Sequence, residues 1–335
     1  MTRVAPRPVL SGDGRAGVVV RDGSAYLFQT AGGQIDRLAT PAEAGLAALD
    51  RTGSRCVISG DDFLALWECG PPSRQLAAVR ISAPLLRLAV DGDLVLGAVA
   101  AEDDRATLQA WQGDGLAAAP GWVALGPTAV DQLLLDGARG QGLVTGLRGP
   151  QSRLGEGEFL ARLYDLRAGT WPALWQGEGG PRRPNGFLFP LAGGALGAYD
   201  RKALTVLRPA GTSGGGGWQT AARHAWGDLE QVVASPSGTF AAWFWSDGGD
   251  DNDDQYRARV AELGKGEVIH DLTIERVGEF PALAVDDEGV PRLVFGERPD
   301  RLVICELQSD ALRPGTTIDI PRTYQRCGCD LKLLV

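Results

Sequence analysis

The chain has 335 residues, with 33 lysines and arginines against 42 aspartates and glutamates and a formal net charge of −9 at pH 7. Because an acidic chain without a basic block repels phosphate backbones, nucleic acid is a poor candidate partner. The longest apolar stretches are far shorter than a membrane span, and residues 1–14 lack the apolar segment of a secretory signal, so we expect no membrane association. The five cysteines, an odd number without framework spacing, favour a reducing cytoplasm.

A hairpin motif recurs along the chain: a short apolar run, a turn rich in Gly, Asp, Ser or Pro, and a second apolar run. The copies cover 9–20, 46–59, 88–99, 133–146, 190–200, 232–245 and 283–295. The residues that end the first runs are Ser11, Asp50, Asp91, Asp136, Leu191, Ser235 and Asp286, at successive spacings of 39, 41, 45, 55, 44 and 51 residues. A motif that recurs at such a spacing is the sequence signature of propeller blades.

Each interval between these hairpins adds two more strand-like runs, such as 63–70 and 75–82 in the second interval. Four short antiparallel strands repeated seven times account for nearly every residue from 4 to 321. The pattern resembles the seven-bladed β-propellers of the broad WD40/YVTN-like kind, which are all-β and have four-stranded antiparallel blades around a central channel. We therefore expect one propeller domain over 1–323, a C-terminal tail over 324–335, and blades at approximately 4–41, 45–82, 85–126, 129–178, 185–227, 229–274 and 280–321.

The long loops are expected on one face of the propeller. In propellers the loops between second and third strands and the loops between blades emerge together, and the long segments of these kinds are 100–106, 147–158, 177–185 and 246–255. A rigid scaffold with variable loops on one side is typical of a binding surface. Acidic residues outnumber basic ones in these loops, so we expect a protein partner with a basic surface.

Two further groups of residues are candidates for partner contact. The compact basic pair Arg182 and Arg183 lies in one of the long loops, although such pairs are more often idle on the surface. The tail ends in an apolar run that we expect to dock on a blade or on a partner, with Leu331, Leu333 and Leu334 as its anchors.

The densest cluster of oxygen ligands is Asp247, Asp250, Asp251, Asn252, Asp253 and Asp254. Ca²⁺ takes six to eight oxygen ligands from flexible segments, so this loop is a candidate for weak Ca²⁺ binding, the one cofactor considered. The spacing does not match an EF-hand, and a solvated loop that opposes aggregation is the simpler interpretation.

Other reactive side chains are few. The two histidines, His224 and His270, fall in fourth strands, which are the outermost strands of blades and far from the channel. Cys327 and Cys329 lack the second pair that a zinc site needs, and Cys56 has the character of a small buried hydrophobe. We therefore identify no catalytic residue in the sequence.

The function favoured by these observations is a non-catalytic protein-interaction scaffold, monomeric in isolation and forming one subunit of a multi-protein bacterial assembly. One alternative is a Ca²⁺-dependent, lactonase-like hydrolase with the ion at the channel mouth. Another is a sensor of small molecules or glycans that uses exposed tryptophans. Because one fold hosts many functions, the fold does not separate these alternatives.

Overall fold

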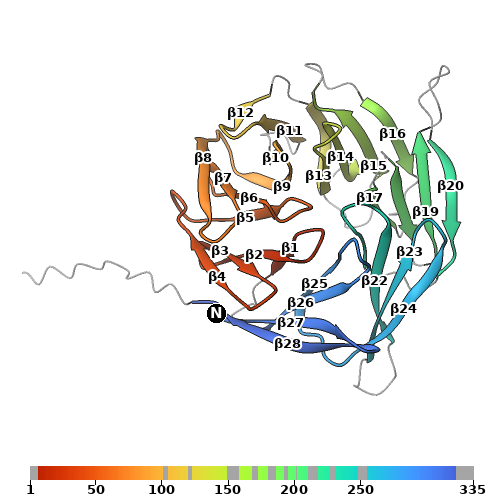
Figure 1. Ribbon diagram of the computed structural model, residues 1–335. Coiled ribbons are helices and arrows are strands. Elements are labelled where there is room, and N and C mark those ends of the chain that lie inside the picture. The colour runs from red at the N-terminus through yellow and green to blue at the C-terminus, as the bar shows by residue number, and fades with distance from the viewer. Residues whose placement is uncertain are drawn as a thin grey trace, which may run out of the picture.

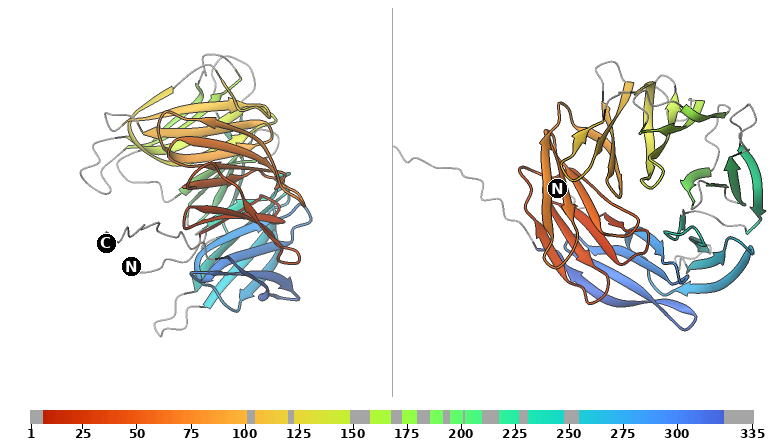
Figure 2. Two further views of the ribbon diagram at one scale, coloured as in Figure 1. Left: turned by 90° about the vertical axis from the view of Figure 1, so that its left-hand side faces the viewer. Right: turned by 45° about the horizontal axis from the view of Figure 1, so that its top comes forward.

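The computed structural model describes residues 7–100, 105–119, 123–148, 158–167, 173–179, 186–191, 195–200, 202–209, 218–226, 231–247 and 255–321. Every regular element in these ranges is a strand, and none of them contains a helix long and apolar enough to cross a membrane. The strands form antiparallel meanders arranged in a ring around a central axis (Figure 1). Figure 2 shows the same ring from the side. The chain is therefore an all-β propeller, as predicted.

The chain begins with two separate four-stranded sheets in which the strands lie in chain order. The first contains β1 (Pro8–Leu10), β2 (Ala16–Arg21), β3 (Ser24–Gln29) and β4 (Ile35–Leu38). The second contains β5 (Leu46–Leu49), β6 (Arg55–Ser59), β7 (Phe63–Glu68) and β8 (Arg74–Arg80).

The next strands form one continuous eight-stranded sheet. It contains β9 (Leu85–Asp91), β10 (Leu94–Ala100), β11 (Arg105–Gln112), the short β12 (Ala117–Ala118), β13 (Val123–Asp136), β14 (Gln141–Arg148), β15 (Glu158–Asp165) and β16 (Ala173–Gly179). The 14-residue β13 pairs with β11 through its first part and with β14 through residues 128–136.

The sequence predicts two separate strands on either side of residue 127, whereas the structure has one continuous strand, β13. The pair Gly126-Pro127, which is typical of a turn, lies inside β13, and the strand changes its partner there: it pairs with β11 up to Pro127 and with β14 from Thr128.

The remaining strands form a four-stranded and an eight-stranded sheet. The former contains β17 (Gly186–Pro190), β18 (Leu196–Asp200), β19 (Leu204–Pro209) and β20 (Trp218–His224). The latter contains β21 (Gln231–Ala234), β22 (Phe240–Asp247), β23 (Gln255–Glu262), β24 (Glu267–Ile274), β25 (Glu279–Val285), β26 (Pro291–Arg298), β27 (Arg301–Gln308) and β28 (Ala311–Asp319). A short parallel pairing of Thr273 and Ile274 with Ala311 and Leu312 joins its two halves.

The hydrophobic core lies between neighbouring meanders. One buried cluster joins Val18 and Leu27 of the first meander to Ile58 and Ala65 of the second. Another joins the two ends of the chain, with Tyr26 and Phe28 from β3 packed against Val294, Leu302, Ile304, Ile318 and Ile320. Each meander therefore buries both faces against its neighbours, and the ring is stabilised by closing.

Candidate functional site

The first strand of each meander lies toward the axis of the ring, where a cavity of about 700 Å³ opens. Its walls are mostly aliphatic side chains from inner strands, including Val9, Leu49, Leu88, Leu133, Val233 and Leu283. A hollow of this volume is within the range of ligand pockets, which are mostly apolar with a few polar groups. The structure therefore presents a central site with aliphatic walls, to which Arg7, Arg51 and Gln231 add polar groups.

Two exposed apolar side chains lie at the starts of inner strands, at the end opposite the turns that follow these strands. Leu86 and Phe280 are the second residues of β9 and β25 and precede the turn residues Asp91 and Asp286 by five and six positions. They are 41 and 40% exposed and are two of the five large hydrophobic residues that are exposed in the described part of the chain. Val9, a third, precedes the turn residue Ser11 by only two positions and so lies nearer the other mouth. We call Leu86 and Phe280 the apolar rim. Apolar groups exposed beside a cavity are typical of an interaction site.

Phe280 of the apolar rim is in contact with Arg7. Phe280 has a backbone φ of 52°, an unfavourable conformation for a bulky residue, at a register irregularity of β25. The guanidinium carbon of Arg7 lies 5.9 Å from the centre of its ring, a cation–π contact, and Arg7 also lines the cavity. No ion pair of Arg7 with an acidic side chain is found among the described residues. Strain in an exposed aromatic residue is typical of functional sites.

The other mouth of the cavity is built from the turns that follow the inner strands. The residues predicted to end the first runs are buried here, and six of them are polar: Ser11, Asp50, Asp91, Asp136, Ser235 and Asp286. In four turns the carbonyl of this residue accepts a hydrogen bond from the amide of a glycine three residues later, at Gly14, Gly53, Gly238 and Gly289. These glycines have φ between 67° and 80°, which explains why the hairpin motif contains glycine at this position.

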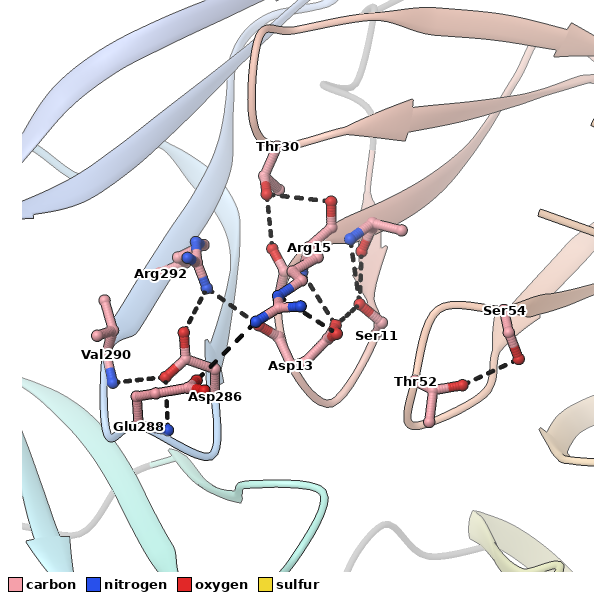
Figure 3. Close-up of polar contacts among 12 residues, drawn as sticks. Ser11, Asp13, Arg15, Thr30, Thr52, Ser54, Asp286, Glu288, Val290 and Arg292 are labelled. Atoms are coloured by element: carbon pink, nitrogen blue, oxygen red, sulfur yellow. Dashed lines mark hydrogen bonds and ion pairs between the residues drawn. The ribbon is translucent and has the colours of Figure 1, made fainter. Parts of the chain in front are cut away.

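The buried side chains also cap their own turns. Asp50 accepts hydrogen bonds from the amides of Ser54 at 2.8 Å and Arg55 at 3.2 Å. Asp286 accepts from the amides of Glu288 at 3.1 Å and Val290 at 2.8 Å (Figure 3). These residues therefore satisfy buried amides and hold the turns in shape, which assigns them a structural role.

Arginines connect one turn to the next. Arg51 donates to Asp91 from Nε at 3.2 Å and from Nη2 at 2.6 Å, and its Nη2 lies 3.4 Å from Asp136. Burial lowers the pKa of the Arg51 guanidinium, but the hydrogen bonds and charges of the two aspartates outweigh this effect and raise the pKa above its ordinary value. Three neighbouring meanders are thereby joined through one side chain.

The ring of turns is also joined where the two ends of the chain meet. Arg292 donates to its own turn through Asp286 at 3.1 Å and to the backbone carbonyl of Asp13 in the first turn, also at 3.1 Å (Figure 3). The amide of Asp13 in turn donates to the carbonyl of Arg51 at 3.2 Å. This mouth is consequently a network of satisfied polar groups, in contrast to the apolar rim.

Most of the site residues predicted from the sequence lie outside the described residues. These are Asp250, Asp251, Asp253, Asp254, Arg182, Arg183, Leu331, Leu333 and Leu334, together with Asn252, Cys327 and Cys329. Asp247 is the last residue of β22, where its backbone pairs with Gln255. In the described ranges no group of three or more His, Cys, Asp or Glu side chains is arranged to hold a metal ion. The Ca²⁺ prediction therefore stays a prediction.

The histidines lie where they were predicted, in strands at the outside of the ring. His224 ends β20 and stacks on Trp226 at 4.8 Å between ring centres, and Trp226 stacks in turn on Trp243 at 4.6 Å. His270 lies in β24, and the neighbouring Asp271 binds Arg257 and Arg259 at 2.8 and 3.0 Å. Both histidines therefore belong to the outer packing of the ring. Cys56 is fully buried, as predicted.

The apolar rim and Arg51 were not identified from the sequence. Arg51 directly follows a turn residue, and nothing near it in sequence indicates a partner 40 residues away. The rim has a signal that is visible in retrospect, since both of its members lie at the start of an inner strand. An apolar residue at a strand start also suits burial, so the sequence pattern alone does not distinguish the two environments.

No protein-family model and no curated protein sequence matches this chain. Solved structures do match its fold. A functionally unknown protein from Desulfotomaculum acetoxidans aligns with a TM-score of 0.59 and 13% identity over 91% of this chain and 95% of that chain. KlAtg21, solved as a complex with the coiled-coil of AgAtg16, aligns with a TM-score of 0.59 and 8% identity over 95% of this chain and 100% of that chain.

The β-propeller domain of Cps50 (Swd1) from Myceliophteria thermophila also matches, with a TM-score of 0.52 and 13% identity over 92% of this chain and 95% of that chain. At these identities the similarity establishes the fold. The chain therefore has the β-propeller fold.

Proposed function

We propose that this protein is a non-catalytic interaction scaffold that binds a protein partner at the mouth of the cavity bordered by the apolar rim. The observation that carries the proposal is the exposure of Leu86 and Phe280 at the starts of two inner strands. KlAtg21, a structure of similar fold, was solved in complex with a coiled-coil, so a protein partner for such a propeller has a precedent. Anchoring side chains of an interface typically enter apolar pockets near its centre.

The finer architecture belongs to the same proposal. We take the ring as seven four-stranded blades in one domain over 1–323, with β13 supplying the outermost strand of one blade and the innermost strand of the next. The long loops would then surround the rim, with Arg182 and Arg183 in one of them and Leu331, Leu333 and Leu334 in the tail as additional contacts. Because the loops are rich in acidic residues, the partner has a basic surface and binding weakens as salt rises. The protein is a cytoplasmic subunit of a bacterial assembly in this proposal.

The proposal is tested by capture from a lysate of the native host with full-length bait. Leu86→Asp and Phe280→Asp place a charge in the rim and should abolish capture of a specific protein. Val268→Asp is the matched control, because Val268 has the same exposure, 42%, but lies on the outer strand β24. Loss of the captured protein with all three variants, or with none, contradicts the proposed site. Melting curves of each variant confirm that the bait is folded.

A further inference from the structure

The central cavity changes in polarity from one end to the other. The level of a lining residue is given by how many positions it precedes the turn residue of its own inner strand. At three positions before the turn the lining residues are Leu88, Leu133, Val232 and Leu283. Every inner-strand residue that lines the cavity one or two positions before the turn is also aliphatic. These levels span roughly 10 Å, at about 3.3 Å per residue, so the middle of the cavity is an aliphatic tube.

The polar groups at the turn end of this tube are already bound to the protein. Arg51 donates to Asp91 and lies 3.4 Å from Asp136, so its charge is neutralised in place. The hydroxyl of Ser11 donates to Asp13 at 2.6 Å. A charged group that entered here would have to compete with these bonds. The turn end of the cavity therefore suits the apolar end of a ligand.

The opposite end of the tube carries a positive charge. Arg7 and Gln231 line the cavity four positions before the turn residues of their strands. The guanidinium carbon of Arg7 lies 5.9 Å from the centre of the Phe280 ring, and among the described residues no acidic side chain is paired with it. Arginine binds a carboxylate through two parallel N–H donors. This end therefore complements an anionic head group, whereas the walls complement a hydrocarbon chain.

We propose that the central cavity binds an aliphatic monocarboxylate, with the carboxylate on Arg7 and the chain extended along the aliphatic walls toward the turns. The volume of about 700 Å³ is within the range of small-molecule pockets. The head group would lie beside Phe280, so the ligand alters the surface that a partner meets at the apolar rim. This site goes beyond the proposed function, because ligand binding is measured without any protein partner.

Isothermal titration calorimetry of the full-length protein tests the class of ligand. Octanoate should bind saturably, with a negative heat-capacity change from the burial of its chain. Acetate lacks the chain and octylammonium has the opposite charge, so each should bind at least tenfold more weakly. Absence of saturable octanoate binding, or equal binding of acetate or octylammonium, overturns the proposal. Binding of a peptide that ends in a leucine carboxylate, without binding of octanoate, also overturns it and identifies a protein tail as the occupant.

Substitutions in the full-length chain test the location. Arg7→Gln should weaken octanoate binding at least tenfold and leave the weaker binding of octanol unchanged, because octanol has no charge to pair. Val9→Asp places a like charge in the wall at a position that is 37% exposed, and should also weaken octanoate binding at least tenfold. Arg74→Gln is the matched control, because Arg74 binds Glu68 on exposed strands and does not line the cavity.

Melting curves of the three variants confirm that each is folded. Wild-type affinity for octanoate in Arg7→Gln or in Val9→Asp contradicts the site, and so does an equal loss in Arg74→Gln. If octanoate does not bind while the rim variants still lose the partner, the proposed function stands and the ligand inference fails.

Discussion

At the scale of single residues, the buried polar groups explain how this sequence closes its turns. Asp50 is only 2% exposed, and its carboxylate accepts hydrogen bonds from two amides as well as from the hydroxyl of Ser54 at 2.7 Å. The aspartate is therefore a substitute for backbone partners that a tight hairpin cannot supply. Its contribution is separable from its charge, because amides need an acceptor and not a full negative charge.

Asp50→Ala should lower the free energy of unfolding by about 1–3 kcal/mol, since it leaves buried amides without an acceptor. Asp50→Asn keeps an oxygen at the same place and should cost less than about half as much. Urea denaturation of the two variants and the wild type measures both values. Equal losses from the two substitutions would mean that charge, and not hydrogen bonding, is what the turn requires.

Asp287 gives a pH-dependent link between two turns. Its carboxylate accepts from the amide of Ser237 at 2.9 Å, and this bond joins the turn after β21 to the turn after β25. Burial raises the pKa of Asp287, but the hydrogen bonds from Ser237 outweigh it and hold the pKa below the usual aspartate value. A depressed pKa means that the stabilisation is fully present above about pH 4 and is lost as the pH falls further.

Asp287→Asn should therefore shrink the fall in melting temperature between pH 5 and pH 3 relative to the wild type. The control is Asp61→Asn, which removes an exposed carboxylate for which no hydrogen bond or ion pair is found in the described structure. Asp61→Asn should leave the fall in melting temperature between pH 5 and pH 3 unchanged. An identical acid response in all three proteins contradicts the role of Asp287.

At the scale of strands, one glycine shows how a sheet accommodates an aromatic ring. Gly17 of β2 pairs directly with Phe28 of β3, and a Cβ atom at Gly17 would lie 2.0 Å from the Cζ of that ring. Phe28 is fully buried and belongs to the cluster that joins the first meander to the last. The glycine is required because the ring lies over the opposite backbone position, and not because of its φ.

Gly17→Ala should destabilise the protein by about 1–3 kcal/mol, because the ring or the strand must move to admit the methyl group. Gly264→Ala is the matched control, since no atom lies within 4 Å of a Cβ built there, and it should change stability by less than about 0.5 kcal/mol. Thermal or urea unfolding compares the two. A neutral Gly17→Ala would show that Phe28 has room to rotate away.

The strands also show which parts of this fold are predictable from the sequence. Hairpins such as Ser235–Phe240 were predicted because the glycine and the capping side chain are local to the turn. The arginine link from Arg51 to Asp91 was not, because the distance between two turns depends on the curvature of the ring. The parallel pairing of Thr273 with Ala311 depends in the same way on how two meanders are placed. The loop and tail residues predicted to meet a partner lie outside the described residues, so their role remains a proposal.

At the scale of the whole molecule, the ring closes by packing between its first and last meanders. The first sheet contains only β1 to β4 and the strands β25 to β28 follow one another in order, so no strand is exchanged between the chain ends in the described structure. Closure instead relies on the cluster around Phe28 and Ile318 and on the hydrogen bonds from Arg21 and Tyr26 to Ile320 and Pro321. A ring closed in this way should open first at this interface when the interface is weakened.

Ile318→Ala should lower stability by about 2–4 kcal/mol, because Ile318 is 2% exposed and the substitution leaves a cavity in the closing cluster. Native-state hydrogen exchange should then accelerate in β2, β3, β27 and β28 well before β13 and β14, because local opening follows the weakest interface. Leu143→Ala is the control: Leu143 is equally buried, in β14, and its loss should not accelerate β2 or β3 selectively. Uniform acceleration of all strands by Ile318→Ala would show instead that the ring unfolds as one unit and that its closing interface is no weaker than the others.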